Sequence, residues 1–208
     1  MSDRLIIELK RLLNKIKEDP SIGADRRRHI EKTILYLLFL LSSGAEKIPQ
    51  IAQKRRQMPS KEEHYRRNRF MPEQFLPSSP QEAVAWGWDD SVGSDCHQFT
   101  SPDRSNVKYV SPDGKSEVIF ASDGSVVTAS EDYGTYNFSS PLHDPIGHFY
   151  QDVLPWIIWG NDETDSTTVS QRLEAFVVYG GASVLCSKLE ELGVRISARQ
   201  LLNGGSLQ

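Results

Sequence analysis

The spacing of apolar residues changes near Asn106, and this change constrains the fold more than any other feature of the 208-residue chain. Before it, leucine and isoleucine recur every three or four residues, as on one face of a helix. After it, the runs "NVKYV", "SEVIF" and "SVVT" carry the β-branched and aromatic residues typical of strands. The intervening "SPDGK" and "ASDGS" each contain Asp-Gly, which favours a tight turn. These patterns predict helices followed by an antiparallel meander of three strands.

Helices are expected on both sides of this meander. The first begins at the N-terminus and ends before Asp19, and the second runs from about Asp25 to Ser43. Ser79 and Pro80 are typical of the start of a short helix. The segment "GTYNF" is expected to be a fourth strand, and apolar periodicity predicts two helices after Val169. The predicted fold class is α+β: N-terminal helices, a small antiparallel sheet of three or four strands, and C-terminal helices.

Charge divides the chain into two regions. Residues 1–70 carry 17 Lys and Arg against 9 Asp and Glu, a net of +8, whereas residues 71–208 carry 7 against 19, a net of −12. This asymmetry suggests a basic helical region, 1–70, and an α+β domain, 71–208, with different partners or with mutual attraction. The basic stretch before Pro72 is compatible with solvated helices or with a loop that grips a polyanion.

Composition excludes several classes of protein. Two cysteines provide neither a disulfide framework nor the paired spacing of a zinc site, which indicates a reducing compartment. The longest apolar run, "ILYLLFLL", is shorter than the roughly 18 to 20 residues that cross a bilayer, and no secretory signal is visible. We therefore expect a chain made in the cytoplasm, with no membrane segment. Phosphate-loop, dinucleotide-binding, zinc-protease and hydrolase motifs are missing.

The stretch "DDSVGSDCH" is rich in residue types that bind metal ions. It offers Asp89, Asp90, Asp95 and His97 as ligands for a divalent ion. Clustered aspartates are equally typical of turns, and Cys96 beside His97 does not favour a thiol nucleophile, because neighbours on a strand point to opposite faces. The sequence therefore assigns no metal and no cofactor.

The segment from Gly134 to Asp162 gathers histidines, tyrosines and acids in a turn-rich context. RNA cleavage without a metal needs a base for the 2′-hydroxyl, an acid for the leaving oxygen and donors for the phosphate. The candidate catalytic residues are His148, Glu117, Tyr136 and His143. The candidate substrate-binding residues are Lys108, Arg104, Tyr133 and Arg172. Each also has an ordinary structural interpretation: core aromatics, a residue at a helix start, or an edge-strand charge.

From Pro72 to Leu173 the chain resembles the C-terminal toxin domains of bacterial polymorphic toxins, the variable tips of RHS, PAAR or contact-dependent delivery proteins. The segments "NVKYVSPDGKSEVIF", "GTYNF" and "PIGHFYQDVLPWIIWGN" carry the resemblance. It implies an antibacterial effector that acts inside a target cell and is neutralised by a cognate immunity protein. Residues 1–70 lie outside it and would contact a delivery apparatus or chaperone, or complete the catalytic fold.

Three hypotheses follow from the residues and the resemblance together. The first is a metal-independent ribonuclease toxin, with RNA as the substrate. The second is a toxin that consumes NAD or transfers ADP-ribose, for which tyrosine and glutamate on strands also suffice. The third is a non-enzymatic immunity or adaptor protein, whose acidic residues 71–208 would block a basic toxin.

Overall fold

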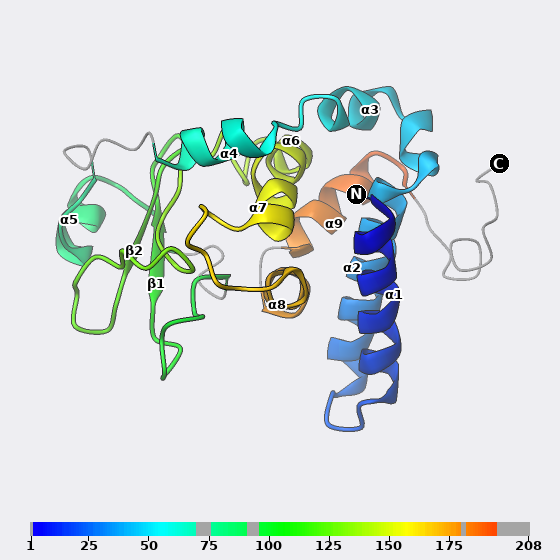
Figure 1. Cartoon of the computed structure of the whole chain (residues 1–208), viewed down its shortest axis with the longest axis horizontal. Helices are drawn as coiled ribbons and strands as arrows, with labels where there is room; N and C mark the ends of the chain where they lie inside the picture. The colour runs from blue at the N-terminus through cyan, green and yellow to red at the C-terminus, as the bar shows by residue number, and fades with distance from the viewer. Residues whose placement is uncertain (1, 70–75, 91–95, 180–181, 195–208) are drawn as a thin grey trace. The chain divides into compact units, whose positions relative to one another are not determined.

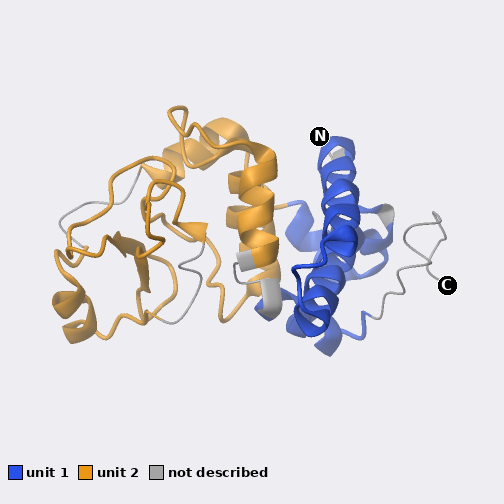
Figure 2. Ribbon diagram, turned by 90° about the horizontal axis from the view of Figure 1, so that it is seen from below, with its two compact units in different colours: residues 1–56, 182–208 blue, residues 57–181 orange. Residues whose placement is uncertain are grey.

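The computed structural model describes residues 2–69, 76–90, 96–179 and 182–194. The chain divides into two compact units (Figure 2). Unit 1 comprises residues 1–56 and 182–208, and unit 2 comprises residues 57–181. The division differs from the expected one at residue 70 because the C-terminal helix belongs with the N-terminal helices, while the last basic helix belongs with the sheet.

Unit 1 is built on two long helices that lie side by side as a hairpin (Figure 1). Helix α1 spans Ser2–Glu18 and α2 spans Ala24–Leu41, close to the predicted bounds. The short η1 (Ser43–Lys47), α3 (Pro49–Arg55) and α9 (Ala182–Glu191) complete the unit. The apolar repeat predicted for α1 is its buried face, comprising Leu5, Leu9, Leu12, Leu13 and Ile16.

Helix α9 packs against α2 through both apolar and polar groups. Leu185 and Leu189 of α9 are buried, as their spacing predicted. The Tyr36 hydroxyl donates to Glu190 at 3.1 Å, which ties the two helices together. Because burial and this carboxylate both disfavour the phenolate, the pKa of Tyr36 is raised to about 12. The predicted Gly180-Gly181 break before α9 lies outside the described residues.

The helices of unit 2 frame a small sheet. They are α4 (Lys61–Asn68), α5 (Pro80–Ala85), α6 (Pro145–His148), η4 (Phe149–Val153), α7 (Leu154–Trp159), α8 (Val169–Glu174) and η5 (Ala175–Tyr179). The Ser79 hydroxyl accepts from the Glu82 amide, which confirms the predicted start of α5. Asp144 caps α6 in the same way, accepting from the Gly147 amide.

Helices α6, η4 and α7 follow one another without a break, and η4 is a π-helical turn placed just before Pro155. Proline has no amide hydrogen and its ring collides with the preceding turn of a regular helix. A wider π-turn accommodates both defects. The kink or fresh start expected at Pro155 therefore takes this form, and it keeps α6 and α7 on one continuous path.

The sheet has two antiparallel strands in the described residues, β1 (Val107–Val110) and β2 (Glu117–Phe120) (Figure 1). Val107 pairs with Phe120 and Val110 pairs with Glu117. The predicted meander of three or four strands is therefore wrong beyond the first hairpin. The segments "SVVT" and "GTYNF" make only single bridges, Phe120 to Val126 and Ser116 to Tyr136.

A shared edge explains why these two segments are not strands. The Val127 amide donates to Ile119 near one end of β2, and the Glu117 amide donates to Thr135 near the other. Each segment therefore occupies only half of a four-residue edge. Gly134 lies so close to β2 that a Cβ there would be 2.1 Å from the Glu117 carbonyl oxygen. Only glycine allows this approach.

Candidate functional site

The β1–β2 hairpin has two chemically different faces, because side chains alternate along a strand. Tyr109, Val118 and Phe120 lie on one face and form an apolar cluster with Ala83 of α5. Lys108 and Glu117 lie on the other face, at diagonal positions of the ladder, and both are buried. The polar face is therefore enclosed by the fold.

Glu117 is the centre of the polar face. Its Oε1 accepts from the Lys108 ammonium at 3.0 Å and from the Asn137 amide at 2.7 Å. The side chains of Lys108 and Glu117 are 8% and 4% exposed, so the ion pair is shielded from water. Burial raises the pKa of Glu117, but Lys108, His97 and Asn137 outweigh it and lower the pKa to about 2. Glu117 is thus held as a carboxylate.

His97 is also buried beside Glu117, and its Nε2 lies 3.8 Å from Glu117 Oε2. The His97 Nδ1 lies 3.1 Å from the Asp132 carbonyl oxygen. The side-chain amide of Asn106 donates to the carbonyl oxygen of His97. Burial, together with the Lys108 charge, lowers the pKa of His97 to about 4. The imidazole is therefore neutral near pH 7, with Nδ1 donating to the carbonyl.

His148 and Asp152 form a dyad on one helical path. His148 ends α6 and Asp152 lies one turn later in η4, with 3.3 Å between Nδ1 and the carboxylate. Nδ1 also lies 3.0 Å from the Ser139 carbonyl oxygen. Both neighbours are acceptors, so Nδ1 carries the proton and Nε2 of the neutral ring holds a lone pair. Within the described part of the chain, Nε2 has no hydrogen-bond partner.

Asp152 is itself fixed by the backbone. Its two oxygens accept from the amides of Phe138 at 3.0 Å and Ser139 at 3.2 Å. A carboxylate held in this way fixes the orientation and tautomer of the imidazole beside it. The His148 side chain is 16% exposed, against 4% for Glu117, so it is the more accessible of the two.

The structure brings three of the predicted site residues together. Glu117 and Lys108 are paired, and His148 lies close enough that a positive charge on its ring would lower the pKa of Glu117. Tyr136 packs edge-on against Phe138, whose backbone amide holds Asp152. Tyr136 therefore adjoins the dyad, but through packing, as its ordinary structural interpretation expected.

The other predicted residues lie elsewhere in unit 2. His143 and Arg104 are exposed on loops. The Tyr133 hydroxyl lies 3.4 Å from an Asp162 oxygen, and burial together with that carboxylate raises its pKa far above the usual value. Arg172 is buried and donates to the carbonyl oxygens of Ile157, Ile158 and Thr167. It thereby caps the end of α7 and is engaged within the fold.

Sequence reasoning missed Asp152 and Asn137 and did not place His97 in this cluster. The signal for Asp152 was available, because it follows His148 by four residues and such residues share a helix face. Asn137 and His97 carried no comparable signal. Their contacts with Glu117 arise from segments that meet only when the loops fold onto β2.

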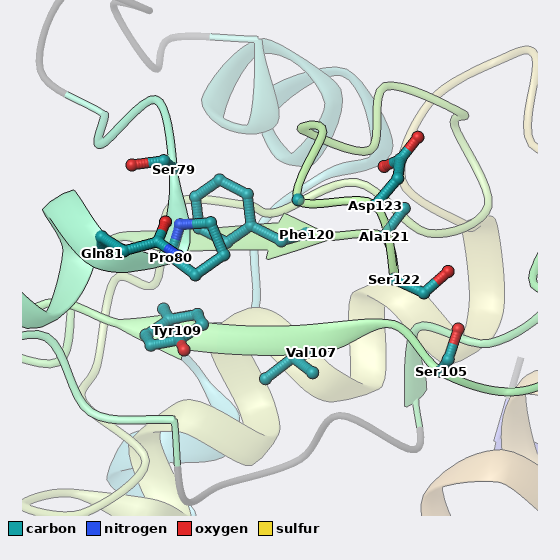
Figure 3. Close-up of a pocket in the computed structure, with 11 residues that line it drawn as sticks. Ser79, Pro80, Gln81, Ser105, Val107, Tyr109, Phe120, Ala121, Ser122 and Asp123 are labelled. Carbon is teal, nitrogen blue, oxygen red and sulfur yellow. The ribbon is translucent and has the colours of Figure 1, made fainter.

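A pocket of about 440 Å³ lies on the apolar side of the hairpin. Tyr109 and Phe120 line it together with Val107, while Ser122 and Asp123 form part of its rim (Figure 3). It lies on the opposite face of the hairpin from Glu117. Across the described ranges, no group of three or more His, Cys, Asp or Glu side chains is placed to hold a metal ion. In those ranges no helix is long and apolar enough to cross a bilayer.

Comparison with known proteins yields no match. No protein-family model, no curated protein and no solved structure is significantly similar to this chain.

Proposed function

We propose that this chain is a toxin domain that cleaves RNA without a metal ion, with His148 as its general base. The His148–Asp152 dyad carries the proposal. An accepting Nε2 on a ring whose tautomer is fixed by a carboxylate is the arrangement that general-base catalysis requires. His148 is more exposed than His97, the other histidine near Glu117, and the nearby carboxylates of Asp152 and Glu117 are both largely buried.

The proposed reaction begins when His148 Nε2 takes the proton of a ribose 2′-hydroxyl. The 2′-oxygen forms a bond to the adjacent phosphorus, the bond to the 5′-oxygen breaks, and the imidazolium gives its proton to that leaving oxygen. The products are a 2′,3′-cyclic phosphate and a free 5′-hydroxyl. Glu117 acts through its field on His148, because its carboxylate is buried and paired with Lys108. This role replaces the direct base role expected from the sequence.

The proposed biological setting is delivery into a competing bacterium, with a cognate immunity protein that protects the producer. In this setting residues 1–70 contact the delivery apparatus or a chaperone. The α4 helix, however, lies in the same unit as the dyad. This arrangement supports assigning the residues after Arg56 to the catalytic unit.

The test is RNA cleavage by the purified chain in the presence of a chelator. We expect oligoribonucleotides with 2′,3′-cyclic phosphate ends, and no cleavage when the 2′-hydroxyl is absent. The His148→Ala variant should be slower by about 10²- to 10⁴-fold, the usual contribution of a general base. His29→Ala is the matched control, because His29 is exposed on α2 of unit 1. Intact RNA with wild-type protein under all conditions excludes the proposal.

A further inference from the structure

Arg67 of α4 is held rigidly against the segment that supports the His148–Asp152 dyad. Its Nε donates to Glu63 Oε1 at 2.8 Å, one helical turn away. Its guanidinium carbon lies 3.5 Å from the centre of the Phe138 ring, close enough for face-to-face stacking. The side chain is 17% exposed. Two contacts thus fix the guanidinium plane, and neither of them uses its terminal nitrogens.

The terminal nitrogens of Arg67 are not used by the fold. Nη1 is buried and has no hydrogen-bond partner among the described residues. Nη2 also bonds to nothing there, since the contacts of Arg67 are those with Glu63 and Phe138. Buried donors in folded proteins are almost always paired, with protein, water or a ligand. The edge of this guanidinium therefore lacks an acceptor.

Arg172 shows what a purely structural buried arginine looks like in the same unit. All three of its guanidinium nitrogens donate to acceptors of the fold, including the carbonyl oxygens of Ile157 and Thr167. Arg67 differs from Arg172, because only its Nε donates within the described fold, to Glu63 of the same helix.

Arg67 and His148 flank the same two residues. Arg67 stacks on the Phe138 ring, and the Nδ1 of His148 donates to the Ser139 carbonyl oxygen. Asp152 accepts from both backbone amides of this pair, so its negative charge is already engaged. Arg67 and the dyad are therefore linked through one two-residue segment, Phe138 and Ser139.

We infer that Arg67 binds a phosphate group of the substrate. A guanidinium with two free terminal nitrogens offers parallel donors that match two phosphate oxygens. The inference deepens the proposed function, because it rests on the same site and names the group that the site recognises. The phosphate belongs either to an RNA backbone or to the pyrophosphate of a dinucleotide such as NAD, and the two sources can be separated experimentally.

The first experiment measures binding of inorganic phosphate by thermal unfolding, with potassium chloride at equal ionic strength as the reference. A ligand that binds only the folded state raises the midpoint, and the rise grows with the logarithm of ligand concentration above Kd. We expect the phosphate-dependent shift in wild-type protein and in His148→Ala, and its loss in Arg67→Gln, which keeps a planar amide over Phe138. Arg66→Gln is the matched control, since Arg66 bonds to the same Glu63 but is 65% exposed.

The same phosphate shift in Arg67→Gln as in wild type overturns the inference. If Arg67→Gln does not fold, Arg67→Lys serves instead, since it keeps the charge but loses the planar fork. It should bind phosphate at least tenfold more weakly, and unchanged affinity overturns the inference equally. Absence of any phosphate shift in wild-type protein also overturns it.

The second experiment identifies the source of the phosphate by competition. A non-cleavable RNA, deoxy at the 2′-position, and NAD are each titrated against wild-type protein and Arg67→Gln. Competition by RNA that depends on Arg67 supports both the inference and the proposed function. Competition by NAD alone retains the phosphate site but refutes the ribonuclease. RNA cleavage with an unchanged KM in Arg67→Gln retains the ribonuclease but refutes the role of Arg67.

Discussion

Replacing Lys108 with methionine tests whether the polar face is as enclosed as the structure shows. Two unit charges 3.0 Å apart attract by about 5 to 6 kcal/mol at an effective dielectric of 20. Methionine keeps the length of the stem and leaves the Glu117 carboxylate buried without its ion partner. Breaking a buried pair in this way typically costs about 3 to 5 kcal/mol. We expect unit 2 to lose that amount of unfolding free energy at pH 7.

Tryptophan fluorescence during urea unfolding is the assay, because Trp86, Trp88, Trp156 and Trp159 all lie in unit 2. Arg66→Met is the control, since its 2.8 Å pair with Glu63 is largely exposed. Pairs of that kind contribute about 0 to 1 kcal/mol. A loss in Lys108→Met no larger than in Arg66→Met would show that the Lys108–Glu117 pair is solvated, and the account of an enclosed polar face would fall.

The pH dependence of the same variant has a definite sign. In wild-type protein the pKa of Glu117 is lowered to about 2. The ionised carboxylate therefore stabilises the folded state fully above pH 4.5, and this contribution is lost as the pH falls towards 2. Lys108 is the largest of the contributions that lower this pKa, and without it only His97, Asn137 and His148 oppose burial. The pKa of Glu117 in the folded variant is therefore higher than in folded wild-type protein. The destabilisation of Lys108→Met should therefore shrink as pH falls from 7 to 5.

Three further predictions concern neighbouring groups. The pKa of His97 is lowered to about 4. The neutral ring therefore contributes to the stability of the folded state above pH 6.5, and this contribution declines as the pH falls towards 4. In His97→Gln, the unfolding free energy measured in urea should depend less on pH between 6.5 and 4. Gly134→Ala places a methyl group against the Glu117 carbonyl and should lower unfolding free energy by about 2 kcal/mol, whereas a neutral result would contradict the close approach. Asp152→Asn should slow RNA cleavage while the protein stays folded by circular dichroism, and unchanged kcat would remove Asp152 from the site.

The parts of the fold that the sequence predicts are those decided by local pattern. The buried face of α1 follows from its leucine spacing, and the β1–β2 hairpin follows from alternation around Asp113-Gly114. The later segments have equally good strand composition, yet each gains only a single bridge. The composition of a segment indicates whether it can pair with the edge of a sheet. It does not indicate whether another segment already pairs with half of that edge, as happens at β2. The error at "SVVT" and "GTYNF" is of this kind.

The candidate site divides in the same way. Glu117 and His148 were predicted from residue type and context, and Lys108 reaches Glu117 because the hairpin places them diagonally. Arg67 could not be predicted as part of the site. The sequence shows only a basic helix, and charged helices usually face water. The stacking on Phe138 depends on α4 docking near the end of α7, where His64 bonds to the Gly160 carbonyl oxygen.

The buried charges on the hairpin also bear on function. A buried ion pair is weak evidence for stability, because apolar residues of similar volume are often as stable or more so. The opposite face of the same two strands is apolar and shows that the fold can pack such residues there. We therefore expect the double variant Lys108→Met/Glu117→Leu to regain most of the stability lost in Lys108→Met. If it also cleaves RNA at the wild-type rate, the pair has no role at His148; if it is stable but slow, the charges serve the reaction.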